Sequence, residues 1–195
     1  AFGAELILTE GAKGMAGSIE KANELLDKNP NYICLGQFDN EDNPRAHYET
    51  TGPEILKEVK DVSFIVAGIG SGGTIVGAGK FLKEKNKEIK VIGIEPKSSP
   101  LITENKSGPH KIQGIGANFI PKIYDKDIVD KVITVSDEDS YETVRLIANK
   151  LGILIGISSG ANIFGAMKLS DENPDKIIVT VAPDGVDKYM SMGIF

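Results

Sequence analysis

Apolar residues fall along the chain in short continuous runs and in longer stretches with a helical repeat. The short apolar runs are typical of strands, and the most continuous ones of buried strands. They predict strands at 4–11, 32–35 and 130–137, and buried strands at 62–68, 90–96 and 175–185. The longer stretches predict helices at 14–30, 45–59, 74–86, 136–152 and 153–171. Because strands and helices alternate, the sequence predicts an α/β fold with a mostly parallel, twisted sheet and helices on both faces.

Local signals sharpen the ends of these elements. Asn43-Pro44 predicts an N-cap followed by proline at the first helical position. Gly52-Pro53 predicts a kink or a division into two helices. Ser136 or Asp137 is the expected cap of the helix at 136–152. Glycine and proline recur throughout 98–122, which predicts a long loop with short helical pieces of the kind that often carries function.

Composition limits the classes of function. The 195 residues predict one domain, or one domain with part of another, and the net charge of −6 disfavours a nucleic-acid binder. The single cysteine, Cys34, lies in an apolar run and is expected to be a buried core thiol. His47 and His110 lie far apart in the sequence, so no metal site is predicted. With no membrane-spanning run and no signal-peptide pattern in the sequence, we expect a cytoplasmic protein with no membrane partner.

The glycine-rich turn at 68–74 is the main candidate binding site. A strand precedes it and a helix follows, so free N–H groups and the helix dipole favour an anion there. Gly68 to Gly73 satisfies GxGxxG, and Glu95 follows at the spacing of a ribose-binding acid, which fits a dinucleotide. The alternatives are a cup for a single phosphate, or a tight turn that only packs on the sheet.

Five segments, with the glycine turn among them, occur in a fixed order along the chain: QFDNEDNPRAHYETTGPEI, GSGGT, IQGIGANFIP, GISSGA and PDGVDKYMS. In this order the chain resembles the cysteine synthase family, the fold-type II enzymes that depend on pyridoxal 5'-phosphate and include O-acetylserine sulfhydrylase and cystathionine β-synthase. The segment AELILTEGAKGMAGSIEKA is also similar to this family. The resemblance spans nearly the whole chain and makes the single-phosphate cup the favoured interpretation.

The resemblance implies a set of cofactor contacts. It assigns the cofactor phosphate to Gly70, Ser71, Gly72, Gly73 and Thr74. It assigns the pyridine nitrogen to Ser158, the first serine of GISSGA. A neutral hydroxyl does not hold that nitrogen protonated, so the ring is a milder electron sink that suits loss of a β-substituent. The alternative for Ser158 and Ser159 is helix capping.

The resemblance also implies substrate contacts. Gln37 matches a glutamine near the substrate carboxylate and Phe38 matches its aromatic neighbour, while Gly114 and Gly116 belong to a loop that closes over the substrate. Asn118 stands where sulfhydrylases usually have glycine. It is a catalytic candidate that would hold water or the substrate amine, and a side chain there would tilt the enzyme towards cysteine as first substrate. The alternative is that Asn118 tolerates a left-handed turn.

Two parts of the family pattern are missing. The Schiff-base lysine and the loop that grips the substrate carboxylate lie before the matched region. We therefore expect the 195 residues to be the C-terminal portion of the enzyme, with most of the large cofactor-binding domain and the edge of the smaller domain at 1–35. Alone, this segment is expected to bind the cofactor poorly and to catalyse nothing.

The resemblance implies β-replacement or β-elimination on a β-substituted amino acid through an α-aminoacrylate intermediate. The leading reactions join O-acetylserine and sulfide into cysteine, or convert cysteine into hydrogen sulfide plus serine or lanthionine. The expected partners are a small amino acid, sulfide or a thiol, and a second copy of the protein in a homodimer. Two alternatives stay open: an NAD(P)-dependent oxidoreductase that uses GIGSGG and Glu95, and a catalytically silent homologue.

Overall fold

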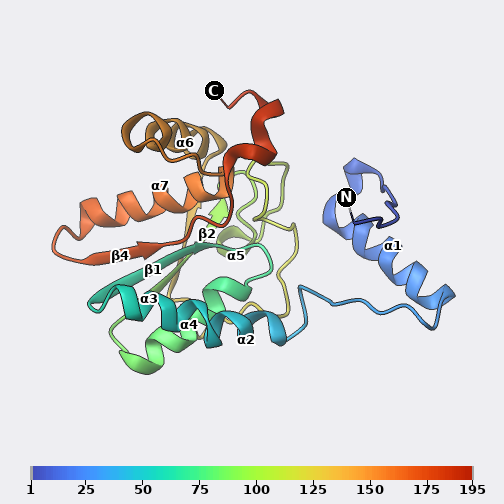
Figure 1. Ribbon diagram of the computed structural model, residues 1–195, viewed down its shortest axis with the longest axis horizontal. Coiled ribbons are helices and arrows are strands. Elements are labelled where there is room, and N and C mark those ends of the chain that lie inside the picture. The colour runs from blue at the N-terminus through green and yellow to red at the C-terminus, as the bar shows by residue number, and fades with distance from the viewer. Residues whose placement is uncertain (1, 195) are drawn as a thin grey trace. The chain divides into compact units, whose positions relative to one another are not determined.

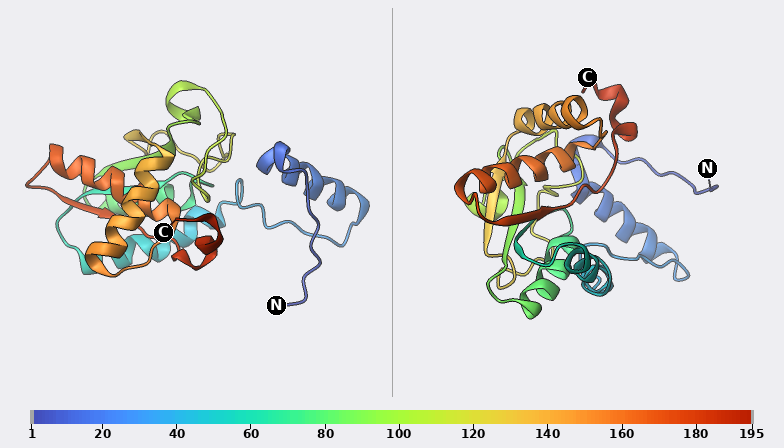
Figure 2. Two further views of the ribbon diagram at one scale, coloured as in Figure 1. Left: turned by 90° about the horizontal axis from the view of Figure 1, so that it is seen from above. Right: turned by 60° about the vertical axis from the view of Figure 1, so that its left-hand side comes forward.

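The computed structural model describes residues 2–194 and divides into two units, Ala1–Gly36 and Gln37–Phe195 (Figures 1 and 2). The first unit holds a short 3-10 helix, η1 (Gly11–Lys13), which leads into α1 (Gly14–Lys28). The second unit holds the sheet and all the other helices of the described residues. The boundary between the two units falls immediately before Gln37, close to the expected edge of the smaller domain.

The first unit confirms the predicted helix and corrects two predicted strands. Four apolar residues of α1 lie half-buried along one face, as the helical repeat predicts: Ile19, Ala22, Leu25 and Leu26. The segments at 4–11 and 32–35, in contrast, are not strands in the described chain, and Leu8 and Ile33 are more than four-fifths exposed. A strand is stable only beside a hydrogen-bonded neighbour, and these segments have none among residues 2–194. Cys34 is also exposed, so the expected core thiol is wrong.

The second unit is built on a four-stranded parallel sheet. Its strands are β1 (Val62–Gly68), β2 (Lys90–Pro96), β3 (Lys131–Val135) and β4 (Ile177–Thr180), in the order β3-β2-β1-β4. All three pairings are parallel, which confirms the predicted sheet. The central strands β1 and β2 are largely buried, whereas β4 is only half-buried because it forms one end of the described sheet. The expectation of a fully buried last strand is therefore wrong.

Helices cover both faces of this sheet, as predicted (Figure 1). One face carries α2 (Asp42–Glu49), α3 (Thr51–Glu58) and α4 (Gly73–Lys85), and the other carries α6 (Asp137–Leu151) and α7 (Ile157–Glu172). Each face has its own apolar core, represented by Ile75 and Leu82 on the first and by Ile94, Val144 and Ile157 on the second. Full burial of each such side chain stabilises the fold by about 1.5–3 kcal/mol.

The helix ends show which local signals were decisive. Helix α6 begins at Ser136, whose Oγ accepts a hydrogen bond from the Asp139 amide at 3.1 Å, as predicted. The chain divides into α2 and α3 at Thr50, and Pro53 falls in the first turn of α3, where its missing N–H removes no helical hydrogen bond. Helix α2 begins two residues earlier than expected, with Glu41 rather than Asn43 as its N-cap. The Asn43 side chain does not cap the helix, because it binds the glycine turn instead.

Two short helices complete the described chain. The loop at 98–122 contains α5 (Leu101–Glu104), which confirms the expected short helical piece, and η2 (Val186–Met192) lies close to the C-terminus. Among residues 2–194, no helix is both long enough and apolar enough to cross a membrane.

Candidate functional site

A cavity of about 270 Å³ lies where several strand ends and helix starts meet. It is lined by the end of β1, the first residues of α4 and α7, and the segment that follows β4. Ligands of parallel α/β sheets bind at this edge. The cavity brings together every predicted cofactor residue and one predicted substrate residue: Gly70, Ser71, Gly72, Gly73, Thr74, Ser158 and Gly114.

The glycine turn is shaped by close packing as much as by its conformation. Gly72 has φ +90°, a left-handed conformation that favours glycine, and α4 begins at the next residue without a side-chain cap. A Cβ on Gly70 would lie 2.3 Å from the Gly114 carbonyl oxygen, and one on Gly73 would lie 1.9 Å from the Asn43 Oδ1. The Gly73 N–H donates to the Ser71 Oγ at 3.4 Å, and the start of α4 lines the cavity, which suits an anion.

Helix α2 supports this turn from behind. The Asn43 Nδ2 donates to the Gln37 carbonyl oxygen at 2.8 Å and to the Ser71 Oγ at 3.0 Å. The His47 ring bridges two hydroxyls, with Nε2 3.1 Å from the Thr74 Oγ1 and Nδ1 2.9 Å from the Thr51 Oγ1. Sequence reasoning missed both side chains. Their signal was the spacing of four residues, which puts them on one face of a helix.

The first turn of α7 presents a single hydroxyl to the same cavity. Ser158 is buried and lines the cavity, and a Cβ on Gly114 would lie 3.7 Å from its Oγ. The N-cap of α7 is Gly156, which makes no side-chain hydrogen bond. The Ser159 Oγ donates instead to the Asp184 carbonyl oxygen at 3.4 Å. Helix capping, the alternative role for both serines, is therefore not what they do in the structure.

Sequence reasoning also missed a polar group opposite the glycine turn. Asp184, in the segment after β4, accepts a hydrogen bond from the Tyr189 hydroxyl at 2.6 Å, and the Lys188 amine lies 3.6 Å away. Burial, together with Asp184, raises the pKa of Tyr189 to about 12. The Asn162 Nδ2 donates to the Val181 carbonyl oxygen at 3.0 Å. The only signal for these residues was the PDG turn that follows a predicted strand.

Two buried oxygens among these residues, the Asn162 Oδ1 and the Asp184 Oδ1, have no hydrogen-bond partner in the part of the chain that the structure describes. Buried polar atoms without a partner are costly, so most are satisfied in native proteins. Both residues line the cavity. The cavity wall therefore offers acceptors to a bound polar molecule or to water.

The other predicted substrate residues do not line this cavity. Gln37 is exposed, and the Phe38 ring packs edge-on against Phe119 with 4.9 Å between ring centres. Gly116 and Asn118 line a separate small crevice, whose lining shares Gly70 with the cavity. The structure thus places these four residues on neighbouring segments and brings none of them to the cavity wall.

Asn118 has the left-handed conformation, with φ +63°. Its Oδ1 accepts a hydrogen bond from the Ser99 Oγ at 2.8 Å, which ties together two parts of the 98–122 loop. Both features favour the conformational role. The catalytic role stays a prediction.

Glu95 has a structural role that conflicts with the dinucleotide interpretation. Its buried carboxylate accepts hydrogen bonds from the Ile102 amide at 2.8 Å and from the Thr103 amide at 3.0 Å, and also from the Thr103 hydroxyl. Both carboxylate oxygens are thereby used to hold α5 at the end of β2. A ribose would have to displace these bonds, so the structure disfavours a nicotinamide dinucleotide at this turn.

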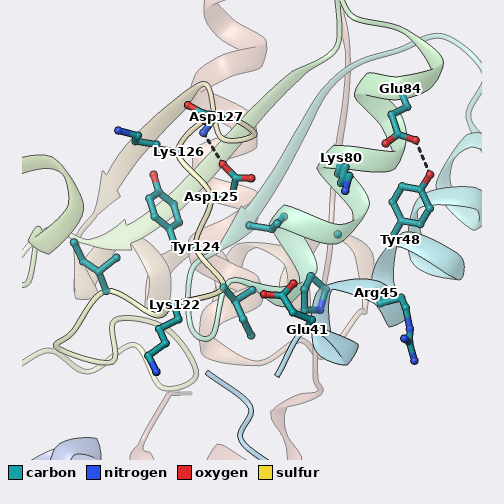
Figure 3. A pocket seen from close by; sticks show the side chains of 15 residues that line it. Glu41, Arg45, Tyr48, Lys80, Glu84, Lys122, Tyr124, Asp125, Lys126 and Asp127 are labelled. Atoms are coloured by element: carbon teal, nitrogen blue, oxygen red, sulfur yellow. Dashed lines mark hydrogen bonds between the residues drawn. The ribbon is translucent and has the colours of Figure 1, made fainter. Parts of the chain in front are cut away.

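A larger groove of about 970 Å³ is lined by residues of α2, α4 and the loop at 120–127 (Figure 3). Its charged lining is balanced, with four basic and four acidic side chains: Arg45, Lys80, Lys122, Lys126, Glu41, Glu84, Asp125 and Asp127. It contains none of the predicted site residues. A balanced lining selects neither an anion nor a cation, so the groove is a weaker candidate than the cavity.

Comparisons with known proteins agree with this geometry. Residues 1–184 match the family described as pyridoxal-phosphate dependent enzyme. Cysteine synthase B of Campylobacter jejuni is 47% identical over 195 residues, and the match covers the whole chain and 65% of that relative. The chain thus spans just under two thirds of the relative's length.

Solved structures show the same relationship. The cysteine synthase of Entamoeba histolytica is 42% identical with a TM-score of 0.94, and the match covers 100% of this chain and 58% of that one. A hydrogen sulfide-producing enzyme from Fusobacterium nucleatum is 40% identical with a TM-score of 0.93, over 99% of this chain and 60% of that one. The sheet and its helices are therefore those of fold-type II enzymes.

Proposed function

The chain belongs to the family of pyridoxal-phosphate dependent enzymes, and from this premise we propose that its protein carries out β-replacement or β-elimination on a β-substituted amino acid. The proposed substrates are O-acetylserine with sulfide, or cysteine, which would give hydrogen sulfide plus serine or lanthionine. The relatives support both reactions, because they include cysteine synthases and a hydrogen sulfide-producing enzyme. The observation that carries the proposal is a single cavity in which the glycine turn at 70–74 faces Ser158.

The cavity fits the phosphate of the proposed cofactor. The turn offers N–H groups at the start of α4, and the Ser71 and Thr74 hydroxyls lie beside them. A Cβ on Gly70 or Gly73 would collide with a neighbouring residue, so neither position has room for a side chain. This arrangement suits one compact phosphate with several acceptor oxygens.

The opposite wall fits a flat, neutral ring. Ser158 is the proposed partner of the ring nitrogen, and its hydroxyl leaves that nitrogen free of any fixed positive charge. Bound pyridoxal phosphate supplies an electron sink for negative charge that develops on the substrate. The protein orients the ring by holding its phosphate at one end and its nitrogen at the other.

The substrate contacts are proposals as well, and they also depend on other parts of the protein. We propose that Gln37 and Phe38 lie near the substrate carboxylate, and that Gly114 and Gly116 let their loop close over it. Asn118 would hold water or the substrate amine there. Residues 1–35 are proposed to be the edge of the smaller domain. A homodimer and a cytoplasmic location, expected from the family resemblance and from the sequence pattern, complete the proposal.

The proposal is tested with the full-length protein that contains this chain. Purified protein should show the visible absorbance of a lysine-linked pyridoxal phosphate. It should also form cysteine from O-acetylserine and sulfide, or release sulfide from cysteine. Gln37→Ala is expected to raise KM while the absorbance band is kept. A protein that binds pyridoxal phosphate but turns over neither substrate would be a silent homologue, and one that binds NAD instead would overturn the cofactor assignment.

A further inference from the structure

Helix α2 packs against the start of α4 because two glycines leave a groove for it. Gly73 and Gly77 lie one turn apart on the same face of α4. A Cβ on Gly73 would lie 1.9 Å from the Asn43 Oδ1, and one on Gly77 would lie 2.0 Å from the Pro44 carbonyl oxygen and 2.8 Å from the His47 Cβ. This groove brings the His47 ring within hydrogen-bond distance of Thr74, which is 27 residues away in the sequence.

His47 lies between two hydroxyls and uses both ring nitrogens. Its Nε2 is 3.1 Å from the Thr74 Oγ1, and its Nδ1 is 2.9 Å from the Thr51 Oγ1. The ring is about half-buried, and this burial lowers the pKa of His47 from its ordinary value. The imidazole is therefore neutral near pH 7, with one nitrogen as donor and the other as acceptor.

The two neutral forms have opposite consequences for Thr74. If the proton is on Nδ1, the ring donates to Thr51, and Nε2 accepts the single hydroxyl proton of Thr74. If the proton is on Nε2, the ring donates to the Thr74 Oγ1, and the hydroxyl proton of Thr74 is free to point into the cavity. A phosphate carries only acceptor oxygens at this site, so it gains a hydrogen bond only from the second form.

We propose that His47 is a positioning residue of the anion site, the middle of a hydrogen-bond relay from Thr51 to Thr74. The Thr51 hydroxyl donates to His47 Nδ1, the His47 Nε2–H donates to the Thr74 Oγ1, and the Thr74 hydroxyl donates to the bound phosphate. No proton is transferred in this relay; it fixes the direction of one donor. The inference rests on the proposed function, because the anion it serves is the cofactor phosphate.

The tautomer of His47 is the direct readout. Nitrogen NMR of the full-length protein distinguishes the two ring forms, and His47→Gln identifies the signal by its loss. Addition of inorganic phosphate to the cofactor-free protein, or of pyridoxal phosphate, should place His47 in the Nε2–H form. An Nδ1–H ring in the loaded protein would overturn the relay.

Binding of pyridoxal phosphate gives a second readout that does not depend on turnover. His47→Leu removes the relay and is expected to weaken cofactor binding about 10-fold and to shift the phosphorus resonance of the bound cofactor. His47→Gln places an amide near the Nε2 position, so it should recover most of the affinity. Arg45→Gln, on the exposed side of the same helix, is the matched control and should change neither quantity.

A double-mutant cycle separates positioning from general packing. In a Thr74→Val background the relay has no end point, so His47→Leu should then weaken binding less than 3-fold. Undiminished weakening in that background would show that His47 acts only through packing and would overturn the inference. If the wild-type protein fails to bind pyridoxal phosphate at all, the proposed function itself fails, and this outcome is distinct because it appears before any variant is made.

Discussion

The cavity receives the first turns of two helices, α4 and α7, and their surroundings differ. The start of α4 has Gly72 in a left-handed conformation and two further glycines at which a Cβ would clash with a neighbouring residue. Its hydroxyls form hydrogen bonds with Asn43 and His47. The start of α7 offers the Ser158 hydroxyl, with the Asp184 carboxylate close to its N-cap. Both helices carry the same partial positive charge at this end. Their neighbours therefore decide what each can bind.

This comparison indicates that the two helix starts bind different parts of a ligand. The α4 turn has donors and no carboxylate among the cavity-lining residues of its own segment, so it suits a full negative charge. The α7 turn has the ion pair of Asp184 and Lys188 beside it, so the charges there offset each other and this side suits a neutral partner. A cofactor with one charged end and one neutral ring matches both.

The largest expected effect on cofactor binding comes from adding a side chain to the glycine turn at the start of α4. Gly73→Ala places a Cβ 1.9 Å from the Asn43 Oδ1, so the turn or α2 must move. We expect pyridoxal phosphate binding to fall by about 100-fold or more, and stability to fall by about 1–3 kcal/mol as in other overpacked sites. Spectroscopic titration and urea unfolding of the full-length protein measure these changes.

Gly11→Ala is the matched control for the closed turn. A Cβ on Gly11 meets nothing within 4 Å, so binding should be unchanged. If the Gly73→Ala protein bound the cofactor tightly, the α4 turn would not be the phosphate site, and the proposed difference between the two helix starts would be wrong.

The α7 turn is expected to affect turnover more than binding. Ser158→Ala removes the hydroxyl proposed for the ring nitrogen and leaves the phosphate turn intact. We expect turnover to fall about 10- to 100-fold, as for loss of one polar contact in a catalytic site, with cofactor affinity changed less than 3-fold. Titration with pyridoxal phosphate and product assays separate the two quantities. An equal loss of turnover and of cofactor affinity would mean that the two turns do not have separate roles.

Asp184 and Tyr189 give a pH-dependent test of the α7 side. The folded-state pKa of Tyr189 is raised to about 12, above its ordinary value of about 10, so the protonated phenol stabilises the fold. This contribution is complete below about pH 10 and is lost as the pH rises from about 10 to 12. We expect Asp184→Asn to lower that pKa and to reduce this pH dependence, while the part that burial causes remains. Phenolate absorbance during an alkaline titration measures the shift, and an unchanged midpoint would contradict the pairing.

The smallest expected effect is the loss of the N-cap of α6, a helix start with a structural role. The Ser136 Oγ accepts from the Asp139 amide, so Ser136→Ala should cost about 1 kcal/mol of unfolding free energy. Neither α4 nor α7 has such a cap, and the first turns of both helices line the cavity. Ser158→Ala should therefore cost less stability than Ser136→Ala in urea unfolding. The reverse order would make Ser158 a structural residue.

The sequence predicted the second unit better than the first for a physical reason. The strands β1 and β2 are continuous apolar runs that are buried on both faces, and such runs carry their own signal. The segments at 4–11 and 32–35 have similar apolar content but no strand beside them in the described chain. Whether a short apolar run forms a strand depends on its neighbours, which local patterns do not reveal.

The candidate site shows the same limit. Gly70 to Thr74 were predicted because a glycine turn before a helix is a local feature, whereas Ser158 was assigned by the family resemblance. The structure brings both to one cavity. His47 was missed because it meets Thr74 through tertiary packing. Asp184 was missed although its partners Lys188 and Tyr189 lie four and five residues away in the sequence. His47 reaches Thr74 only across the groove at Gly73 and Gly77, and periodicity alone does not predict that crossing.

The hydrogen bonds of Glu95 also have a mechanical consequence. They attach the first turn of α5 to the end of a central strand, so the backbone at 102–103 cannot shift without uncovering a buried carboxylate. Gly116 is anchored likewise, through its amide and the Ile69 carbonyl oxygen at 3.0 Å. Any movement of residues 104–115 is therefore limited at both ends, by Thr103 and by Gly116. Asn105 and Gly114, which have left-handed backbone conformations, lie next to these two fixed points.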